Sequence, residues 1–447
     1  MVGRGRVPTS ESSSSCVLKF THELDGRRRG AARQSSARVS SNSFGIGLPD
    51  IEAARDRIAG VVVRTPTVPA LALGDRTPAS LHLKLESQQR TGSFKDRGAL
   101  NRLLALSDAE RRGGVVTASA GNHAQAVAYH GQRLGVPVHV VMPEHTPLIK
   151  VLNTRRFGAE IRFRGETLSD AMVEARRMET DDGLVLVHAF DDDRVIAGQG
   201  TIGLELLDQR PDLTTVVVPI GGGGLISGIA IAIKEQKPSI KIFGVEAAAA
   251  ASALASRRAD SIVSIESSET IADGIAVKRV GGRTFPIIER YVDDIVAVSE
   301  EEIAHAVHLL LENQKVLAEG AGAVPLAAVL AGKVPLEASD VAVLVLSGGN
   351  IDVNLLERII DRGLVTDGRL VRLAVTVPDR PGNLARLTRL VADAGANVLE
   401  VVHRRVYADI SVRDVEIVLQ LETRGREHLA AIMAALHDAG VSAQEDH

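Results

Sequence analysis

The chain has 447 residues, of which 45% are hydrophobic and 24% are charged, and its formal net charge is -4. These values are ordinary for a globular protein and give no sign of a nucleic-acid-binding surface. Cys16 is the single cysteine, which excludes an internal disulfide framework and a cysteine-based metal site. No apolar run is long enough to cross a bilayer, so we expect a cytoplasmic enzyme.

Residues 1–46 differ from the rest of the chain. They are rich in Ser, Gly and Arg and have no sustained apolar period, which is typical of a disordered extension. From residue 47 to about 364, short β-branched runs such as Val138–Val141 alternate with Ala-rich segments at helical spacing. This order predicts mainly parallel sheets covered by helices on both faces, with a smaller subdomain at about 114–190 inserted in a larger one.

The pattern changes near Leu370. Strands are predicted at Leu370–Val377, Asn397–Val406, Val412–Leu421 and near Val441, with helices at Gly382–Gly395 and Arg426–Ala439. This β-α-β-β-α-β order predicts a ferredoxin-like module over residues 368–447. Because the module contains no catalytic constellation, it is either a dimerisation unit or a regulatory ligand-binding domain.

The most informative stretch is Thr91-Gly92-Ser93-Phe94-Lys95-Asp96-Arg97-Gly98-Ala99. It places one lysine in a small-residue turn that opens an apolar helix. The positive end of the helix dipole disfavours the ammonium form, so this position suits a lysine that acts as a nucleophile toward a carbonyl. Taken alone, the segment is more typical of an ordinary surface lysine near a helix start.

Four consecutive glycines, Gly221 to Gly224, follow the predicted strand Val216–Pro219 and precede an apolar helix. Glycines leave backbone N–H groups free to surround a phosphate, and the helix dipole adds to the attraction. A dinucleotide-binding fold is the rival interpretation, because Glu246 ends the next strand about twenty residues later. That interpretation leaves the Lys95 segment without a role.

Two further polar turns follow predicted strands. Ser119, Gly121 and Asn122 open one helix and could donate hydrogen bonds to a carboxylate, although Ser and Asn are also common helix caps. Ser347-Gly348-Gly349-Asn350 again places a hydroxyl before glycines at a strand end.

Together these segments resemble the pyridoxal-phosphate enzymes of the tryptophan-synthase-β fold type (fold type II), and among them the threonine dehydratases, also called threonine ammonia-lyases. The matching segments include Ser93 to Ala99, Ser119 to Gln125, Ala197 to Thr201, Gly221 to Gly224, Thr270 to Gly274 and Ser347 to Asn350. The stretch Pro378 to Leu384 resembles an ACT domain, a module that binds amino acids.

The resemblance implies pyridoxal 5'-phosphate as the cofactor and Lys95 as the residue that forms a Schiff base with it and moves the substrate's α-proton. It implies cofactor contacts for Phe94, Lys95, Asn122, Gly221, Gly222, Gly223, Gly224 and Ser347. It implies substrate contacts for Ser119, Ala120, Gly121, Asn122 and His123, and effector contacts for Gly382, Asn383 and Leu384. The implied reaction is β-elimination of L-threonine, and of L-serine, to a 2-oxo acid and ammonia in a homodimer or homotetramer, with an amino acid bound at the ACT domain.

Serine racemases and fold-type II synthases are the alternatives within this group. A racemase-type site has a second serine where this chain has Ala120, so poor racemisation is expected. The racemase-type metal site would need carboxylates at Glu246 and six residues later, where Ser252 stands, so we expect no metal there.

Overall fold

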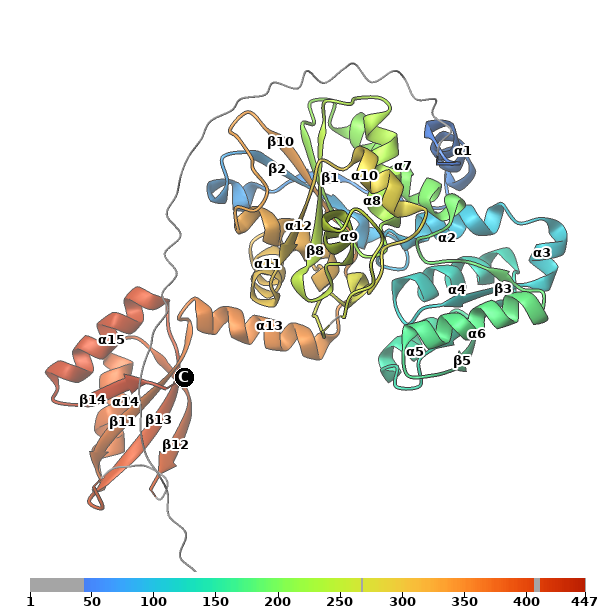
Figure 1. Cartoon of the computed structure of the whole chain (residues 1–447). Helices are drawn as coiled ribbons and strands as arrows, with labels where there is room; N and C mark the ends of the chain where they lie inside the picture. Colours follow the sequence, from blue (N-terminus) through green and yellow to red (C-terminus); the bar gives the residue numbers. More distant parts are fainter. Residues whose placement is uncertain (1–43, 267, 406–410, 447) are drawn as a thin grey trace, which may run out of the picture. The chain divides into compact units, whose positions relative to one another are not determined.

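The computed structural model describes residues 44–266, 268–405 and 411–446. Its largest sheet has six strands in the order β1-β2-β10-β7-β8-β9 (Figure 1). All neighbours in this sheet are parallel except β1 and β2, which are antiparallel. The strands are β1 (Thr67–Pro69), β2 (Ser80–Leu85), β7 (Thr215–Pro219), β8 (Lys241–Ala247), β9 (Asp294–Val298) and β10 (Val341–Leu346).

Alternate residues of these strands supply two separate cores. Val217 and Leu344 pack with α11 (Glu300–Glu312), α12 (Gly320–Leu330) and α13 (Val353–Thr366). Val216 and Val343 face the other way and pack with α7 (Asp193–Gln209), α8 (Gly224–Lys234) and α10 (Thr284–Tyr291). Continuous apolar strands are buried on both faces for this reason, which confirms the predicted α/β class.

A second, smaller sheet is entirely parallel and has the order β5-β4-β3-β6. Helices α2, α4 and α5 pack on one face of it and α6 packs on the other. Its strands are β3 (Val115–Ala118), β4 (Val138–Met142), β5 (Glu160–Phe163) and β6 (Val185–Leu186). Its helices are α2 (Lys95–Leu104), α4 (Asn122–Leu134), α5 (Leu148–Arg155) and α6 (Leu168–Asp181).

Three further helices and four 3-10 turns lie in the described chain before residue 370. They are α1 (Leu48–Ile58), α3 (Asp108–Gly113) and α9 (Ser252–Arg258), with 3-10 turns η1 (Leu71–Arg76), η2 (Glu86–Gln88), η3 (Ala248–Ala250) and η4 (Asp273–Ile275). Within the described residues, no helix combines the length and the apolar character needed to span a membrane.

The C-terminal domain has an antiparallel sheet in the order β12-β13-β11-β14. Its elements are β11 (Leu370–Pro378), α14 (Asn383–Asp393), β12 (Asn397–Arg404), β13 (Asp414–Glu422), α15 (Arg426–Asp438) and β14 (Ser442–Glu445). This sequence of elements confirms the predicted β-α-β-β-α-β module. The predicted end of the second strand, Val406, lies outside the described residues.

The first described residues already contribute to a core. Residues 1–43 lie outside the described part, but Ile46 is buried in a core with Ile51 and Ile196, and the Phe44 ring lies 6.1 Å from that of Tyr291. These contacts lie close to the predicted boundary at about residue 46, and the extent of the N-terminal extension stays a prediction.

A buried ionic network holds the start of α2 against β2 and α7. The Arg97 guanidinium donates to both oxygens of Glu86, at 2.8 and 2.7 Å, and to Glu205 at 2.6 Å. Lys84 also pairs with Glu205. The side chains of Arg97, Glu86 and Lys84 have no exposed surface. Two cations and two anions thus balance one another away from water.

Helices α2 and α7 approach one another at a pair of glycines next to this network. A Cβ on Gly98 would lie 2.4 Å from the Gln199 amide nitrogen, and one on Gly198 would lie 2.6 Å from the Gly98 Cα. Only glycine allows two helices to approach this closely. Gly98, which directly follows Arg97, therefore serves the packing of α2 on α7.

We predict that Arg97→Met lowers the free energy of unfolding of the region that contains the two α/β sheets by about 3–5 kcal/mol, because it leaves a buried carboxylate without its partner. The double variant Arg97→Met/Glu86→Leu should lose less unfolding free energy, because the one cation and one anion that remain, Lys84 and Glu205, still balance one another. Urea unfolding measures both, with Arg64→Met as the surface control, whose pair with Asp208 is exposed on both sides. A loss in Arg97→Met no larger than in this control would contradict the prediction.

Candidate active site

Lys95 is the first residue of α2 and follows the turn after β2. Its Nζ donates a hydrogen bond to the Ala189 carbonyl at 2.8 Å and lies 5.0 Å from the centre of the Phe94 ring. Loss of contact with water lowers the pKa of Lys95 to about 8, and the nearby Glu319 carboxylate opposes this shift. Lys95 therefore has the environment of a reactive amine rather than that of a surface lysine.

The glycine loop lies beside the same segment. It connects β7 to α8, and a Cβ on Gly222 would lie 2.2 Å from the Phe190 ring. The Thr284 hydroxyl donates to the Gly222 carbonyl at 2.7 Å and fixes the loop from the other side. Because Phe190 follows Ala189 directly, residues 189 and 190 link the Lys95 amine to the glycine loop.

Asn122 and Ser347 are joined to the Lys95 turn by hydrogen bonds. Asn122 is the first residue of α4, and its Oδ1 accepts a hydrogen bond from the Asn350 amide at 2.8 Å. The Ser347 carbonyl, at the end of β10, accepts from the Phe94 N–H at 3.0 Å. The ends of β2 and β10, which are parallel neighbours in the large sheet, thus come together around Lys95 with the end of β3, which belongs to the smaller sheet.

Glu319 is a residue of this site that the sequence analysis missed. Its Oε1 accepts a hydrogen bond from the Asn122 amide at 2.8 Å. Burial raises the pKa of Glu319 to about 7, and the Asp273 charge adds to this shift. A signal was present, because Glu319 is the only carboxylate from Ala318 to Leu330, a run of otherwise small and apolar residues.

The turn of residues 119–123 leads from β3 into α4. The Ser119 hydroxyl accepts from the Gly121 N–H at 3.3 Å, and the Ala120 side chain offers no polar atom. His123 is buried, and its Nε2 donates to the Val187 carbonyl at 3.0 Å. Burial lowers the pKa of His123 to about 3, and the Lys95 charge adds to this shift. The ring is therefore neutral and is hydrogen-bonded to Val187, which directly follows β6.

The Glu246 carboxylate is occupied by backbone donors. Its two oxygens accept from the N–H groups of Ala253 and Leu254, both at 2.8 Å, at the start of α9. Burial raises the pKa of Glu246 to about 7, and these hydrogen bonds oppose the shift. Glu246 thus caps a helix, which is a role distinct from binding either a ribose or a metal ion.

A separate cavity of about 310 Å³ lies in the C-terminal domain. It is bounded by Gly382 in the loop between β11 and α14, by Asn383 and Leu384 at the start of α14, and by His403 and Arg405. The Asn383 amide donates to the Pro378 carbonyl at 2.7 Å and fixes this loop. The three residues expected to contact an effector therefore border one cavity.

Two family models match this chain. Residues 58–348 match the model of pyridoxal-phosphate dependent enzymes, and residues 371–441 match the ACT domain. The chain therefore belongs to the pyridoxal-phosphate dependent enzymes and carries a C-terminal ACT domain.

Relatives cover nearly the whole chain. An L-threonine ammonia-lyase of Thermotoga maritima is 48% identical over 88% of this chain and 97% of its own length. One of Geobacter sulfurreducens is 47% identical over 87% of this chain and 97% of its own length. Among solved structures, the processed form of threonine deaminase isoform 2 from Solanum lycopersicum covers 70% of this chain and 91% of its own, with 38% identity and a TM-score of 0.66. Maize serine racemase covers 72% and 98%, with 36% identity and a TM-score of 0.68.

The residues present fit pyridoxal phosphate, the cofactor of this family. The glycine loop has no room for side chains at Gly222, where Phe190 would clash, and it opens α8, whose first N–H groups have no partner within the helix. Lys95 supplies an amine with a lowered pKa beside this loop. The Ser93 hydroxyl, next to Gly348, is buried without a hydrogen-bond partner among the described residues.

We predict that the Lys95 amine of the cofactor-free protein titrates near pH 8, well below the ordinary lysine value of about 10.4. Glu319→Gln should lower the pKa of Lys95 further, because it removes a negative charge that stabilises the ammonium form. The rate at which a small acylating reagent modifies Lys95, followed by mass spectrometry as pH rises, measures this pKa. Glu337→Gln, at an exposed position, is the control. A Lys95 rate that keeps rising to about pH 10, as for surface lysines, would refute the prediction.

Proposed function

We propose that this chain is an L-threonine ammonia-lyase that converts L-threonine to 2-oxobutanoate and ammonia, and L-serine to pyruvate and ammonia. The main support for this proposal is the position of the Lys95 amine, which has a lowered pKa and lies beside the glycine loop and the Asn122–Glu319 pair. The 48% identity to an L-threonine ammonia-lyase over 88% of the chain supports the choice of substrate.

Each part of the site has a distinct role in this proposal. Gly221 to Gly224 and the start of α8 bind the cofactor phosphate, while Phe94, Asn122 and Ser347 orient the ring. Bound pyridoxal phosphate supplies the electron sink that lets a substrate α-proton and β-hydroxyl leave. Lys95 holds the cofactor and moves the α-proton at its Nζ, for which a pKa of about 8 is suited near neutral pH.

The turn of residues 119–123 binds the substrate carboxylate in this proposal. Backbone N–H groups at the start of α4 suit an anion, and the Ser119 hydroxyl lies in the same turn. The methyl side chain of Ala120 has no proton to give to the opposite face of the substrate. Elimination is therefore favoured over racemisation.

We predict that Lys95→Ala lowers the rate of 2-oxobutanoate release from L-threonine by about 10³-fold or more, because it removes the group that moves the α-proton. The measurement is 2-oxo acid release with added pyridoxal phosphate. Lys237→Ala, at a surface position outside the site, is the matched control. If Lys95→Ala kept more than a tenth of the wild-type rate, the assignment of Lys95 would be wrong.

We also propose that an amino acid binds the cavity of the ACT domain and regulates the rate. The Asp379 carboxylate and the Arg405 guanidinium, 3.1 Å apart, offer both signs of charge to a zwitterion, and Val415, Ile417 and Leu384 supply apolar walls. A branched-chain amino acid such as isoleucine matches this combination. It regulates only if it binds one state of the enzyme better than the other.

We predict that Gly382→Ala weakens the response to isoleucine while Gly440→Ala does not. Both glycines lie in the ACT domain with positive φ, +94° and +70°, and neither has an atom within 4 Å of an added Cβ. Each substitution therefore carries a similar backbone strain of about 1–2 kcal/mol, but only Gly382 borders the cavity. Calorimetric binding of isoleucine and the ratio of rates with and without it give the comparison, and equal effects of the two variants would contradict the assignment.

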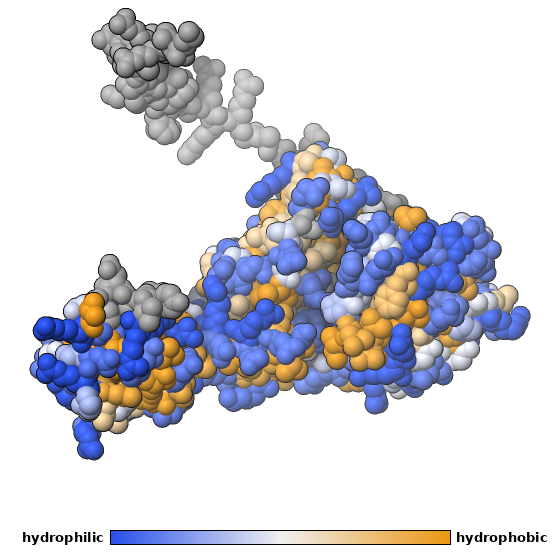
Figure 2. Space-filling view, turned by 90° about the horizontal axis from the view of Figure 1, so that it is seen from below, coloured by the Kyte–Doolittle hydropathy of each residue, from blue (hydrophilic) through white to orange (hydrophobic). Residues whose placement is uncertain are grey.

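We also propose that the protein forms a homodimer or a homotetramer through its ACT domain. Strand β12 is an edge strand, and Leu399, Val401 and Val402 on it are 38% to 51% exposed. Figure 2 shows apolar side chains gathered on the surface of the C-terminal domain. An exposed edge with apolar side chains is a surface that native proteins usually cover, and a second ACT domain is the partner expected here.

A further inference from the structure

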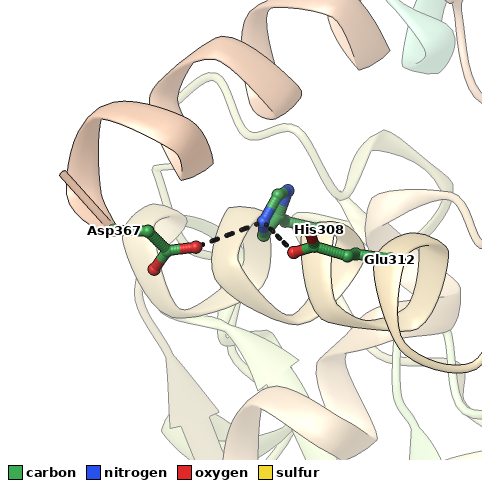
Figure 3. Close-up of side chains that lie close together, drawn as sticks. All are labelled: His308, Glu312 and Asp367. Carbon is green, nitrogen blue, oxygen red and sulfur yellow. Dashed lines mark ion pairs between the residues drawn. The ribbon is translucent and has the colours of Figure 1, made fainter. Parts of the chain in front are cut away.

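Three side chains of metal-ligand type meet where α13 packs on α11. His308 and Glu312 are one turn apart on α11, and Asp367 follows the last residue of α13. The His308 Nε2 lies 3.0 Å from a Glu312 oxygen and 3.6 Å from an Asp367 oxygen. Figure 3 shows both carboxylates directed at the same edge of the imidazole.

The imidazole is buried and lacks a normal hydrogen bond. The His308 side chain is 4% exposed, its Nε2 is in ion-pair contact with Glu312 and Asp367 without a hydrogen bond of regular geometry, and its Nδ1 has no hydrogen-bond partner within the described residues. A buried polar group without such a partner is costly, so its surroundings call for an explanation. The site is also closely built, because a Cβ on Gly363 of α13 would lie 2.7 Å from the ring.

The spacing of the ligand atoms suits a small divalent cation. Ligand atoms about 2.0–2.2 Å from a tetrahedral zinc ion lie roughly 3.3–3.6 Å from one another, close to the two separations observed. Arg369 pairs with the other oxygen of Glu312 and orients that carboxylate, as outer-shell partners of metal ligands do. Glu312 and Asp367 are 36% and 39% exposed, which leaves an entry path and room for a water ligand.

We propose that His308, Glu312 and Asp367 bind one divalent transition-metal ion of the zinc type. Asp367 is three residues before β11, so the ion would fix the segment that leads into the ACT domain to helix α11 of the catalytic region. The site lies outside the candidate active site, and the inference does not depend on the proposed reaction or its substrate.

Equilibrium dialysis of the full-length, cofactor-loaded protein against Zn²⁺, after chelator treatment, tests the proposal. The expected result is one tight equivalent of Zn²⁺ and a rise in melting temperature on its addition. Asp367→Asn and Glu312→Gln should each weaken this binding by more than about tenfold, the lower bound for loss of a mere outer-shell partner. Both variants change a partly exposed carboxylate and leave the buried His308 side chain in place. We therefore expect both variant proteins to fold.

Glu301→Gln is the matched control, since Glu301 lies on the same helix and pairs with Arg362 across two exposed side chains. Retention of the tight equivalent in this variant is expected. Zn²⁺ binding that is absent from the wild type, or equal in all variants, would overturn the proposal. So would a melting temperature that depends on pH through His308 but not on Zn²⁺, because the cluster would then be a proton-dependent ion pair.

Discussion

The buried ionic network around Arg97 is the interaction on which the site depends. It joins β2, α2 and α7 through two carboxylates and two cations that have almost no exposed surface. Such charges are tolerated inside a protein only when each has its partners in good geometry, so the three elements cannot shift independently. Lys95 precedes Arg97 by two residues, and its position at the start of α2 therefore follows from this network.

The electrostatics of the site arise from a second constraint, the shared burial of a lysine and a glutamate. Burial lowers the pKa of Lys95 to about 8 and raises that of Glu319 to about 7, so each group approaches neutrality near physiological pH. Their mutual attraction opposes both shifts. An amine and a carboxyl group that can each change charge near neutral pH thus influence one another, which is an arrangement suited to proton transfer.

Helix α13 connects the catalytic region to the ACT domain, so a regulatory signal between them would pass through it. It packs on α11 through the close contact between Gly363 and His308, and after Asp367 the chain continues into β11 of the ACT domain. An effector at the ACT domain can change the active site only through an element that has two arrangements. The free-energy difference between these arrangements must depend on the state of both sites. A cation held by His308, Glu312 and Asp367 would restrict this element.

The sequence by itself determined the parts of the protein whose signals are local. The Lys95 turn, the glycine loop and the β-α-β-β-α-β module each depend on the order of residues within a short stretch, because turn chemistry and apolar period act over a few residues. Only the tertiary structure decided which distant groups face these stretches. Glu319 beside Asn122, Ala189 on the Lys95 amine, the inward packing of His123 and Asp367 near His308 all join residues that lie far apart in the sequence. Such contacts follow from how the sheets and helices pack, which local patterns do not encode.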